Sequence, residues 1–191
     1  KLPIPPVQGW VQLPGTGQPD WSLHLSSKAA SPNAPIQFGS IKLQGWDLEG
    51  KVEPDGKVVA KTTVSSQLQD LIPKAYADKI KGGKTKWQGQ LTYNAKTPKS
   101  SLEFEGPLSV EQVTVHITPA AGWSANQILV PIRGQYQPGE SKLAFDYQFI
   151  PNQAKQPWIT GRLEVEKDLV KKASGQLDLS QVALQKPPPM T

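Results

Sequence analysis

The feature that most constrains the fold of this 191-residue chain is a two-residue alternation of apolar and polar side chains. Alternation of this kind is typical of β-strands that have one dry face and one wet face, as in antiparallel sheets. The apolar members of the alternating segments are Trp21/Leu23/Leu25, Ile41/Leu43, Leu91/Tyr93, Leu102/Phe104, Val113/Val115/Ile117, Leu143/Phe145/Tyr147/Phe149, Leu163/Val165 and Leu177/Leu179. The sequence therefore predicts a mainly β protein, a curved antiparallel β-sheet built from successive hairpins, either as a half-barrel or groove or as a sandwich.

Four stretches repeat the same order of glycine, strand, polar turn and strand. They begin at Gly50, Gly89, Gly134 and Gly161, and we expect a bulge or sharp twist at each strand start. The predicted turns are Glu53–Gly56, Gln137–Glu140, the longer loop Asn94–Ser100, and Lys171–Gly175. The pattern predicts a meander of hairpins that is extended by adding units.

One segment, residues 65–81, departs from the alternation and has helical spacing. Its apolar residues are Leu68, Leu71, Ile72, Ala75 and Tyr76. Ser65 or Ser66 is expected to cap its start, Pro73 to divide it, and Gly82-Gly83 to stop it. The sequence predicts one short helical insertion that lies against the sheet.

The length and composition predict one domain with extended ends. Residues 1–8 and 186–191 are rich in proline and resemble linkers, so the predicted antiparallel β domain covers residues 9–185, with its helical insertion around 65–81. No stretch reaches the roughly 18 consecutive apolar residues of a membrane span. We expect the chain to be part of a longer protein whose targeting or anchoring segment lies elsewhere.

Charge and cysteine content exclude several classes of site. The net charge of +5 comes from 21 basic residues scattered among 16 acidic ones, which favours a solvated surface over a nucleic-acid site. The densest basic stretch holds Lys79, Lys81, Lys84 and Lys86, with Lys74 just before it, and contact with phosphate or lipid headgroups is the alternative to a solvated surface there. The chain has no cysteine, which excludes disulfides, thiolate metal sites and cysteine nucleophiles.

The residues that could carry catalysis do not form a recognisable site. His24 and His116 fall on wet faces of different predicted hairpins, where an exposed histidine is the simpler interpretation. Glu103 and Glu105 share a strand face, and the alternation explains them as solvent-facing positions. The sequence has no phosphate loop, nucleophile elbow or zinc-protease motif. We predict a protein that is not an enzyme and needs no metal or cofactor.

The six tryptophans admit two interpretations, a stacking platform for a ligand or structural caps on the sheet. Trp10, Trp46, Trp87, Trp123 and Trp158 are predicted at strand starts or loop edges, and Trp21 at the start of a strand. Trp87 and Trp158 lie just before two of the repeat glycines. Their place in the repeat favours the structural role.

Residues 68–115 resemble the AsmA-like superfamily of bacterial envelope proteins. The resemblance consists of an apolar turn, a strand introduced by glycine, a hairpin, and a "G-x-L" strand. Here these elements are Leu71-Ile72-Pro73, Gly82-Gly83, Gly89-Gln90-Leu91 and Gly106-Pro107-Leu108, and residues 158–184 repeat the rhythm. The periplasmic part of the type II secretion system protein N is a smaller relative of similar texture.

The resemblance implies a curved sheet whose apolar face shelters lipid acyl chains, in a periplasmic module tethered to the inner membrane through a segment absent from this chain. The implied function is cell-envelope biogenesis, through lipid transfer or outer-membrane assembly, and the family has no catalytic motif to transfer. The residues expected to line the apolar groove are Leu91, Tyr93, Leu102, Phe104, Leu143, Phe145, Tyr147, Phe149, Leu163 and Val165.

Two alternatives remain open at this point. In a closed sandwich the same ten residues are interdigitated core, and the domain recognises a protein or carbohydrate. In the secretion-subunit version it is a protein–protein interaction module in protein secretion. The expected partners are therefore lipid acyl chains or neighbouring envelope proteins, and not nucleic acid.

Overall fold

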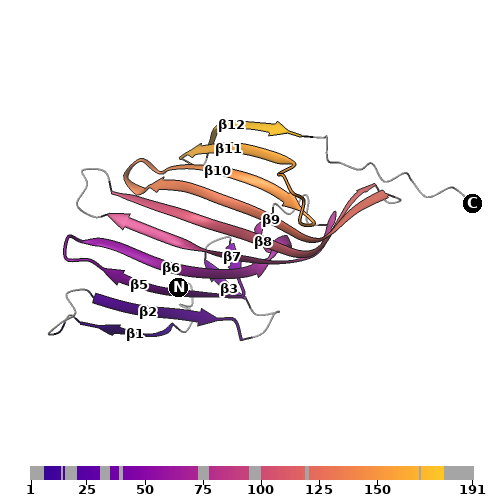
Figure 1. Cartoon of the computed structure of the whole chain (residues 1–191). Helices are drawn as coiled ribbons and strands as arrows, with labels where there is room; N and C mark the ends of the chain where they lie inside the picture. The colour runs from indigo at the N-terminus through magenta and orange to yellow at the C-terminus, as the bar shows by residue number, and fades with distance from the viewer. Residues whose placement is uncertain are drawn as a thin grey trace, which may run out of the picture.

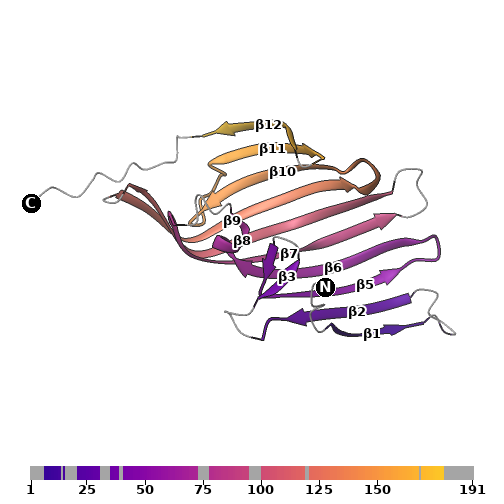
Figure 2. The same ribbon diagram turned by 180° about the vertical axis from the view of Figure 1, so that it is seen from behind.

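The protein consists almost entirely of one open antiparallel sheet (Figures 1 and 2). The computed structural model describes residues 7–13, 15, 21–30, 35–38, 41–72, 78–94, 100–118, 121–167 and 169–178. The sheet has ten strands in the order β1-β2-β5-β6-β7-β8-β9-β10-β11-β12 and is not closed into a barrel. The mainly β, antiparallel fold class predicted from the alternation is confirmed.

The strands lengthen toward the middle of the sheet, so that β8 and β9 extend beyond their neighbours at one end (Figure 1). The strands of the sheet are β1 (Gln8–Gln12), β2 (Trp21–Lys28), β5 (Gly45–Val52), β6 (Lys57–Gln67), β7 (Ile80–Asn94), β8 (Ser101–Thr118), β9 (Ala121–Gln137), β10 (Lys142–Pro151), β11 (Ile159–Glu166) and β12 (Leu169–Leu177). The remaining elements are the hairpin β3 (Ile36–Phe38) and β4 (Ile41–Leu43), the helix α1 (Leu68–Leu71) and the 3₁₀ turn η1 (Pro138–Glu140).

The four predicted units correspond to the hairpins β5–β6, β7–β8, β9–β10 and β11–β12. Each of their glycines lies inside the first strand of its hairpin; Gly89, for example, is the tenth residue of β7. The expectation of glycine at the strand starts was therefore wrong.

Three of the predicted turns can be compared directly with the structure, and the one predicted at Gln137–Glu140 is confirmed by η1 between β9 and β10. Glu53–Gly56 is a turn in which the Gly56 N–H donates to the Glu53 carbonyl at 2.9 Å. The turn predicted at Lys171–Gly175 was wrong, because these residues belong to β12. The chain instead reverses near Lys167, which has a left-handed φ of 49°. Residues 95–99 of the predicted longer loop lie outside the described residues.

The cross-strand register explains why the alternation is so regular. Leu91 of β7 pairs with Ala60 on one side and with Phe104 on the other, and Phe145 of β10 pairs with Gly134 and Leu163. Directly opposed residues in an antiparallel sheet point to the same face. The apolar residues of neighbouring strands therefore meet on one side, and a one-residue slip would turn a whole strand's apolar set to water.

Aromatic side chains lie over the glycines of this face. A Cβ added to Gly134 would lie 2.6 Å from Phe104 Cζ, and one added to Gly161 would lie 2.6 Å from Tyr147 Cζ. The Trp87 ring occupies the corresponding space over Gly89. The repeat glycines thus leave space in which aromatic rings lie flat on the sheet. This packing helps to fix the strand register and covers the backbone at the glycines.

The alternation of inward-facing and outward-facing residues shifts by one position in the middle of β8. Val110 and Val113 are both buried, although strand residues three apart normally point to opposite faces. Gln112, between them, has a left-handed φ of 54°, and the opposing Gly82 and Gly83 have φ values of 74° and 88°. A side chain on Gly82 would collide with the Gln112 carbonyl. The double glycine therefore belongs to this irregularity inside β7, and the prediction that it stops a helix was wrong.

The helical insertion is much shorter than residues 65–81. Ser65 and Ser66 are the last part of β6, the N-cap position is Gln67, and α1 is a single turn. Residues 73–77, which include Pro73, Ala75 and Tyr76, lie outside the described residues. Strand pairing continues because Ser65 and Ser66 lie opposite Lys86 and Thr85 of β7, so sheet register overrides the local helical spacing.

The buried core lies at the end of the sheet that carries α1 and the hairpin β3–β4. Val110, Val113, Ala125 and Ile128 form a buried cluster against which Leu68 of α1 packs. The α1 turn also contacts β4, β6 and β7, and the Ser66 hydroxyl donates to the Lys42 carbonyl of β4. These elements close one end of the apolar side of the sheet.

The glycine–aromatic contacts generate a stability prediction. Gly134→Ala would place a Cβ 2.5 Å from Phe145 Cβ and 2.6 Å from Phe104 Cζ, so we expect it to lower the free energy of unfolding by about 1–3 kcal/mol. Gly139→Ala is the matched control: its Cβ would meet nothing within 4 Å, and we expect a change within about 0.5 kcal/mol. Urea unfolding followed by circular dichroism measures both. Equal effects of the two variants would contradict the packing explanation.

Candidate functional site: the apolar face of the sheet

All ten residues predicted to line an apolar groove lie on the same face of the ten-stranded sheet, and all are half-buried. We call this side, made of the same-facing residues of β2 and β5–β11, the apolar face. The three cross-strand rows that contain the predicted residues of β7–β11, apart from Phe149, are Tyr93–Leu102–Tyr136–Leu143–Val165, Leu91–Phe104–Gly134–Phe145–Leu163 and Ile132–Tyr147–Gly161.

The ten predicted groove residues leave out the part of the apolar face that lies on β2, β5 and β6, although Trp21, Leu23 and Leu25 of β2 were predicted to share a strand face. The first row continues through Val58 and Val52 to Trp21, and the second continues through Ala60 and Gly50 to Leu23. Alternation in "KVVAKTTV" is blurred by threonine and consecutive valines, so only the register of the neighbouring strands reveals it. The apolar face consequently extends across most of the sheet.

Burial on the apolar face deepens toward the end that carries α1. Phe149 packs against the buried cluster, with its ring centroid 6.2 Å from that of Trp123, which is also 6.2 Å from Trp158. The structure therefore places Phe149 at the border of the core. In contrast, Tyr136 is among the exposed large apolar residues, so the more accessible end lies near the hairpin turns.

Within the described residues, the small sheet β3–β4 and α1 cover the apolar face at one end, and no second sheet covers the rest of it. Apart from the main sheet, the strands described there are the short pair β3–β4. The alternative of a closed sandwich thus does not describe this part of the chain. The apolar surface on one side of a single sheet stays in contact with water unless something else covers it.

Two polar atoms on the apolar face are shielded from solvent and have no hydrogen-bond partner in the described structure. They are Trp46 Nε1 and Thr62 Oγ1. Their strands are adjacent, because Trp46 pairs with Val64 and Leu48 pairs with Thr62. Unpaired polar atoms in such positions are costly, and an acceptor oxygen near them would be stabilised.

The structural role predicted for the tryptophans fits some of them and not others. Trp87 covers Gly89, and Trp123 and Trp158 pack together beside the core. Trp10 and Trp21, in contrast, are 49% and 47% exposed near the β1 edge of the sheet. Trp10 lies in the middle of β1 and Trp87 in the middle of β7, so their predicted places at strand starts were wrong.

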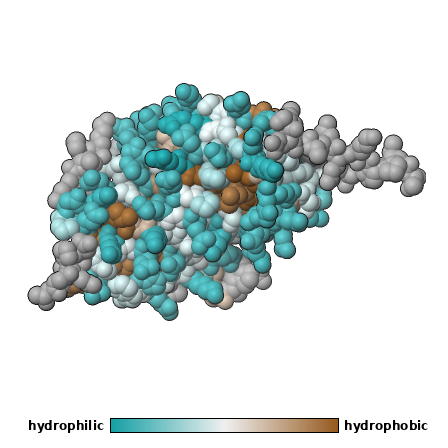
Figure 3. All heavy atoms as spheres, viewed as in Figure 1, coloured by the Kyte–Doolittle hydropathy of each residue, from teal (hydrophilic) through white to brown (hydrophobic). Residues whose placement is uncertain are grey.

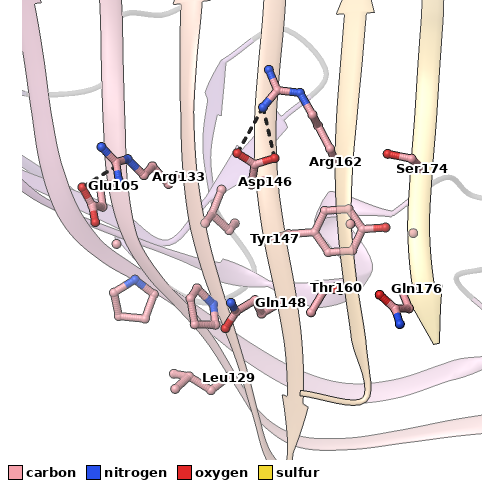
Figure 4. A pocket seen from close by; sticks show the side chains of 16 residues that line it. Glu105, Leu129, Arg133, Asp146, Tyr147, Gln148, Thr160, Arg162, Ser174 and Gln176 are labelled. Carbon is pink, nitrogen blue, oxygen red and sulfur yellow. Dashed lines mark hydrogen bonds and ion pairs between the residues drawn. The ribbon is translucent and has the colours of Figure 1, made fainter. Parts of the chain in front are cut away.

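The opposite face carries the charged residues, and several of them pair across strands. Arg162 Nη1 donates to both carboxylate oxygens of Asp146 at 3.1 Å (Figure 4), and Arg162 Nε donates to Glu164 at 3.0 Å. Arg133 and Glu105 are 3.8 Å apart. Glu103 and Glu105 are both exposed, which confirms their predicted solvent-facing positions.

The histidines differ in their surroundings. His24 lies on the polar face, where its Nε2 is 2.8 Å from Asp47 Oδ2. His116 is half-buried and its Nε2 is shielded without a partner, so its predicted exposure was wrong. The two histidines lie on strands far apart in the sheet order, β2 and β8.

Five hollows lined by described residues open on the polar face. The largest has a volume of about 920 Å³ and is crossed by the paired Asp146 and Arg162 (Figure 4). Viewed as in Figure 1, the surface is mostly hydrophilic with separate hydrophobic patches (Figure 3). Of the ten residues predicted to line an apolar groove, only Tyr147 and Phe104 contribute to the walls of these five hollows.

Within the described ranges, no group of three or more histidine, cysteine, aspartate or glutamate residues could hold a metal ion. The same part of the chain contains no helix long and apolar enough to cross a membrane.

No family model, curated protein or solved structure matches this chain.

The ion pairs of the polar face generate a titration prediction. The Arg162 hydrogen bond holds the pKa of Glu164 below its ordinary value, with smaller contributions from the charges of Arg162, Lys172 and Lys142. Because the folded-state pKa is lowered, this interaction is present above the ordinary pKa of glutamate and is lost as the pH falls through the lowered pKa. NMR titration of the Glu164 side-chain carboxyl measures the effect.

We expect Arg162→Gln to return the pKa of Glu164 toward its ordinary value. Arg133→Gln is the control, since Arg133 pairs with Glu105 instead. An identical Glu164 titration curve in wild-type protein and Arg162→Gln would refute the assigned cause.

Proposed function

We propose that this chain is a non-enzymatic periplasmic module of the AsmA-like type, and that its apolar face binds the acyl chains of lipids during envelope biogenesis. The observation that carries the proposal is the apolar face itself: one side of an open ten-stranded sheet, partly covered at one end by α1 and β3–β4. In the longer protein, a segment outside this chain would tether it to the inner membrane.

The physical support is the free energy of covering apolar surface. Each 100 Å² of apolar surface removed from water contributes about 2.5 kcal/mol. The rows that run from Trp21 to Val165 offer a ligand continuous contact across eight strands. Flexible acyl chains suit this surface because rings and aliphatic side chains alternate along it, with no fixed pattern of polar partners to satisfy.

The two unpartnered polar atoms suggest how an amphiphile would be oriented. An ester or phosphate oxygen supplies an acceptor, which Trp46 Nε1 and Thr62 Oγ1 lack in the described structure. Both residues lie toward the β5–β6 side of the apolar face, whereas the largest aromatic rows lie on β8–β11. The head of a lipid is then expected near β5–β6 and its tails across β7–β11.

A second candidate is a protein-binding module comparable to the type II secretion system protein N. The observation that favours it is the exposure of apolar side chains at both edges of the sheet. Near the β1 edge Val11 and Leu13 are 58% and 61% exposed, and on the β12 edge Val170 and Leu177 are 62% and 57% exposed. A neighbouring envelope protein, rather than lipid, would then cover these positions.

Mass spectrometry of gently purified protein tests the lipid proposal. Phe145→Glu places a charge in the centre of the apolar face, and we expect it to reduce co-purified phospholipid by at least about tenfold. Gln148→Glu is the matched control, because it adds the same charge on the same strand at an exposed position of the polar face. We expect this control to retain the lipid.

Two results would count against lipid binding. One is the absence of phospholipid from wild-type protein that has been expressed in cells containing its native membrane and purified without detergent. The other is equal lipid content in both charged variants. Circular dichroism melting curves on each variant separate loss of binding from unfolding, and Leu91→Glu provides a second position on the same row if Phe145→Glu does not fold.

A further inference from the structure

Within the part of the chain that the structure describes, no strand pairs with the outer edge of β12. In the strand order β12 lies beside β11 alone (Figure 1), and residues 170–177 are exposed without interruption. Edge strands present free backbone donors and acceptors that can pair with another chain. Nine residues long, β12 is also the longer of the two edges, since β1 has five.

The hydrogen bonds of the β11–β12 pair identify which backbone groups are free. The Asp178 N–H donates to the Trp158 carbonyl at 2.8 Å, and Asp178 and Trp158 continue the register in which Leu177 lies opposite Ile159. Backbone groups of successive residues in a strand point to opposite sides. Ser174 and Gln176 therefore bond toward β11.

It follows that the N–H and C=O groups of Ala173, Gly175 and Leu177 point away from the sheet. These three residues would form the hydrogen bonds to an added strand. An added antiparallel strand makes its bonds through alternate residues, so the spacing is correct for a continuous ladder.

The sequence of this edge is self-complementary about Gly175. When a second β12 runs antiparallel with its Gly175 opposite the first, Ala173 lies opposite Leu177 and Ser174 lies opposite Gln176. The same register places Lys172 opposite Asp178, and symmetry produces this charge pair twice. Apolar, polar and oppositely charged residues thus each face a suitable cross-strand partner.

We propose that two copies of this chain associate through their β12 edges, in an antiparallel pair centred on Gly175, to form one continuous sheet. A two-fold axis through Gly175 and perpendicular to the sheet is the symmetry that this pairing requires. The axis keeps each face on its own side, so the apolar face of one copy continues into that of the other. This association goes beyond the proposed lipid binding and does not depend on it.

The other edge of the sheet is a poorer partner for β12. Strand β1 has the sequence QGWVQ, which contains no charged residue. Pairing β12 with β1 would therefore leave Lys172 and Asp178 without opposite charges on the added strand. Lysines on an edge strand also discourage indiscriminate pairing, so a partner that supplies carboxylates at the right register is favoured.

A proline substitution tests whether the outward backbone groups of β12 are used. Gly175→Pro removes an outward N–H and leaves the inward bonds of Ser174 and Gln176 unchanged. A Cβ at position 175 is sterically acceptable, since its nearest contacts would be the Thr160 carbonyl at 3.4 Å and Tyr147 Oη at 3.8 Å. Gly175→Ala adds the Cβ but keeps the N–H, and is the matched control.

Sedimentation velocity over a range of protein concentrations measures the association. We expect wild-type protein and Gly175→Ala to form a dimer, and Gly175→Pro to weaken dimerisation by at least about tenfold. A wild-type chain that stays monomeric at about 100 µM overturns the proposal, as does a Gly175→Pro variant that dimerises like the wild type. Larger concentration-dependent oligomers, as expected for pairing of β12 with β1, overturn it as well.

Charge exchange tests the register itself. Lys172→Asp and Asp178→Lys each convert both charge pairs of the dimer into repulsive pairs, and we expect each variant alone to associate at least about tenfold more weakly than the wild type. Mixing the two variants restores both pairs in a heterodimer, so the mixture should associate again. Failure of the mixture to associate, with both variants folded by circular dichroism, overturns the register centred on Gly175.

The charge-exchange result is independent of lipid content. Each variant is measured again after delipidation with a detergent that is then removed. Dimerisation that survives delipidation supports the β12 pairing, and dimerisation that is lost with the lipid overturns it. Loss of lipid from Phe145→Glu concerns the apolar face alone.

Discussion

Register between neighbouring antiparallel strands is the constraint on which this structure depends. Opposed residues share a face, so each new hairpin must place its apolar residues beside those of the previous hairpin. Leu91, Phe104, Phe145 and Leu163 illustrate the result, since they come from four strands and fall in one row. Because one side of the sheet is apolar and the other is charged, the register of each hydrogen-bond ladder also determines which side chains face water.

The glycines adjust this regular sheet in two different ways. Gly134 and Gly161 provide space for the rings of Phe104 and Tyr147, so large aromatic side chains can lie flat on the apolar face. Gly82 and Gly83 instead adopt left-handed conformations opposite Gln112, where the alternation shifts so that Val110 and Val113 both reach the buried cluster. The first arrangement covers backbone on the open sheet, and the second builds the buried cluster at its end. The same residue type therefore contributes to an accessible surface on β9 and β11 and to a closed core beside β7.

The alternation predicted the antiparallel sheet, the hairpin units and the common face of Leu91, Phe104 and Phe145, because a period of two is a direct consequence of strand geometry. It failed where nonlocal pairing decides the outcome. Ser65 and Ser66 have helical neighbours in sequence but lie opposite β7, and the turn assigned to residues 171–175 is replaced by a reversal near Lys167. A left-handed lysine or glutamine carries no signal comparable to that of glycine, so neither the reversal nor the shift in the alternation of β8 could be predicted from residue type.

An open sheet of this kind has two separate requirements: its apolar face needs cover, and its edges need hydrogen-bond partners. The apolar face is covered by contacts normal to the sheet, whereas the edge finds its hydrogen-bond partners within the plane of the sheet. A two-fold axis at Gly175 satisfies the β12 edge while leaving the residues around Phe145 uncovered, and it doubles the continuous apolar surface. Acyl chains long enough to cross several strands gain from this extension, because they cover more surface without a break. Edge pairing and lipid binding are thus compatible, and a sheet that pairs through β12 presents a wider apolar face than one copy alone.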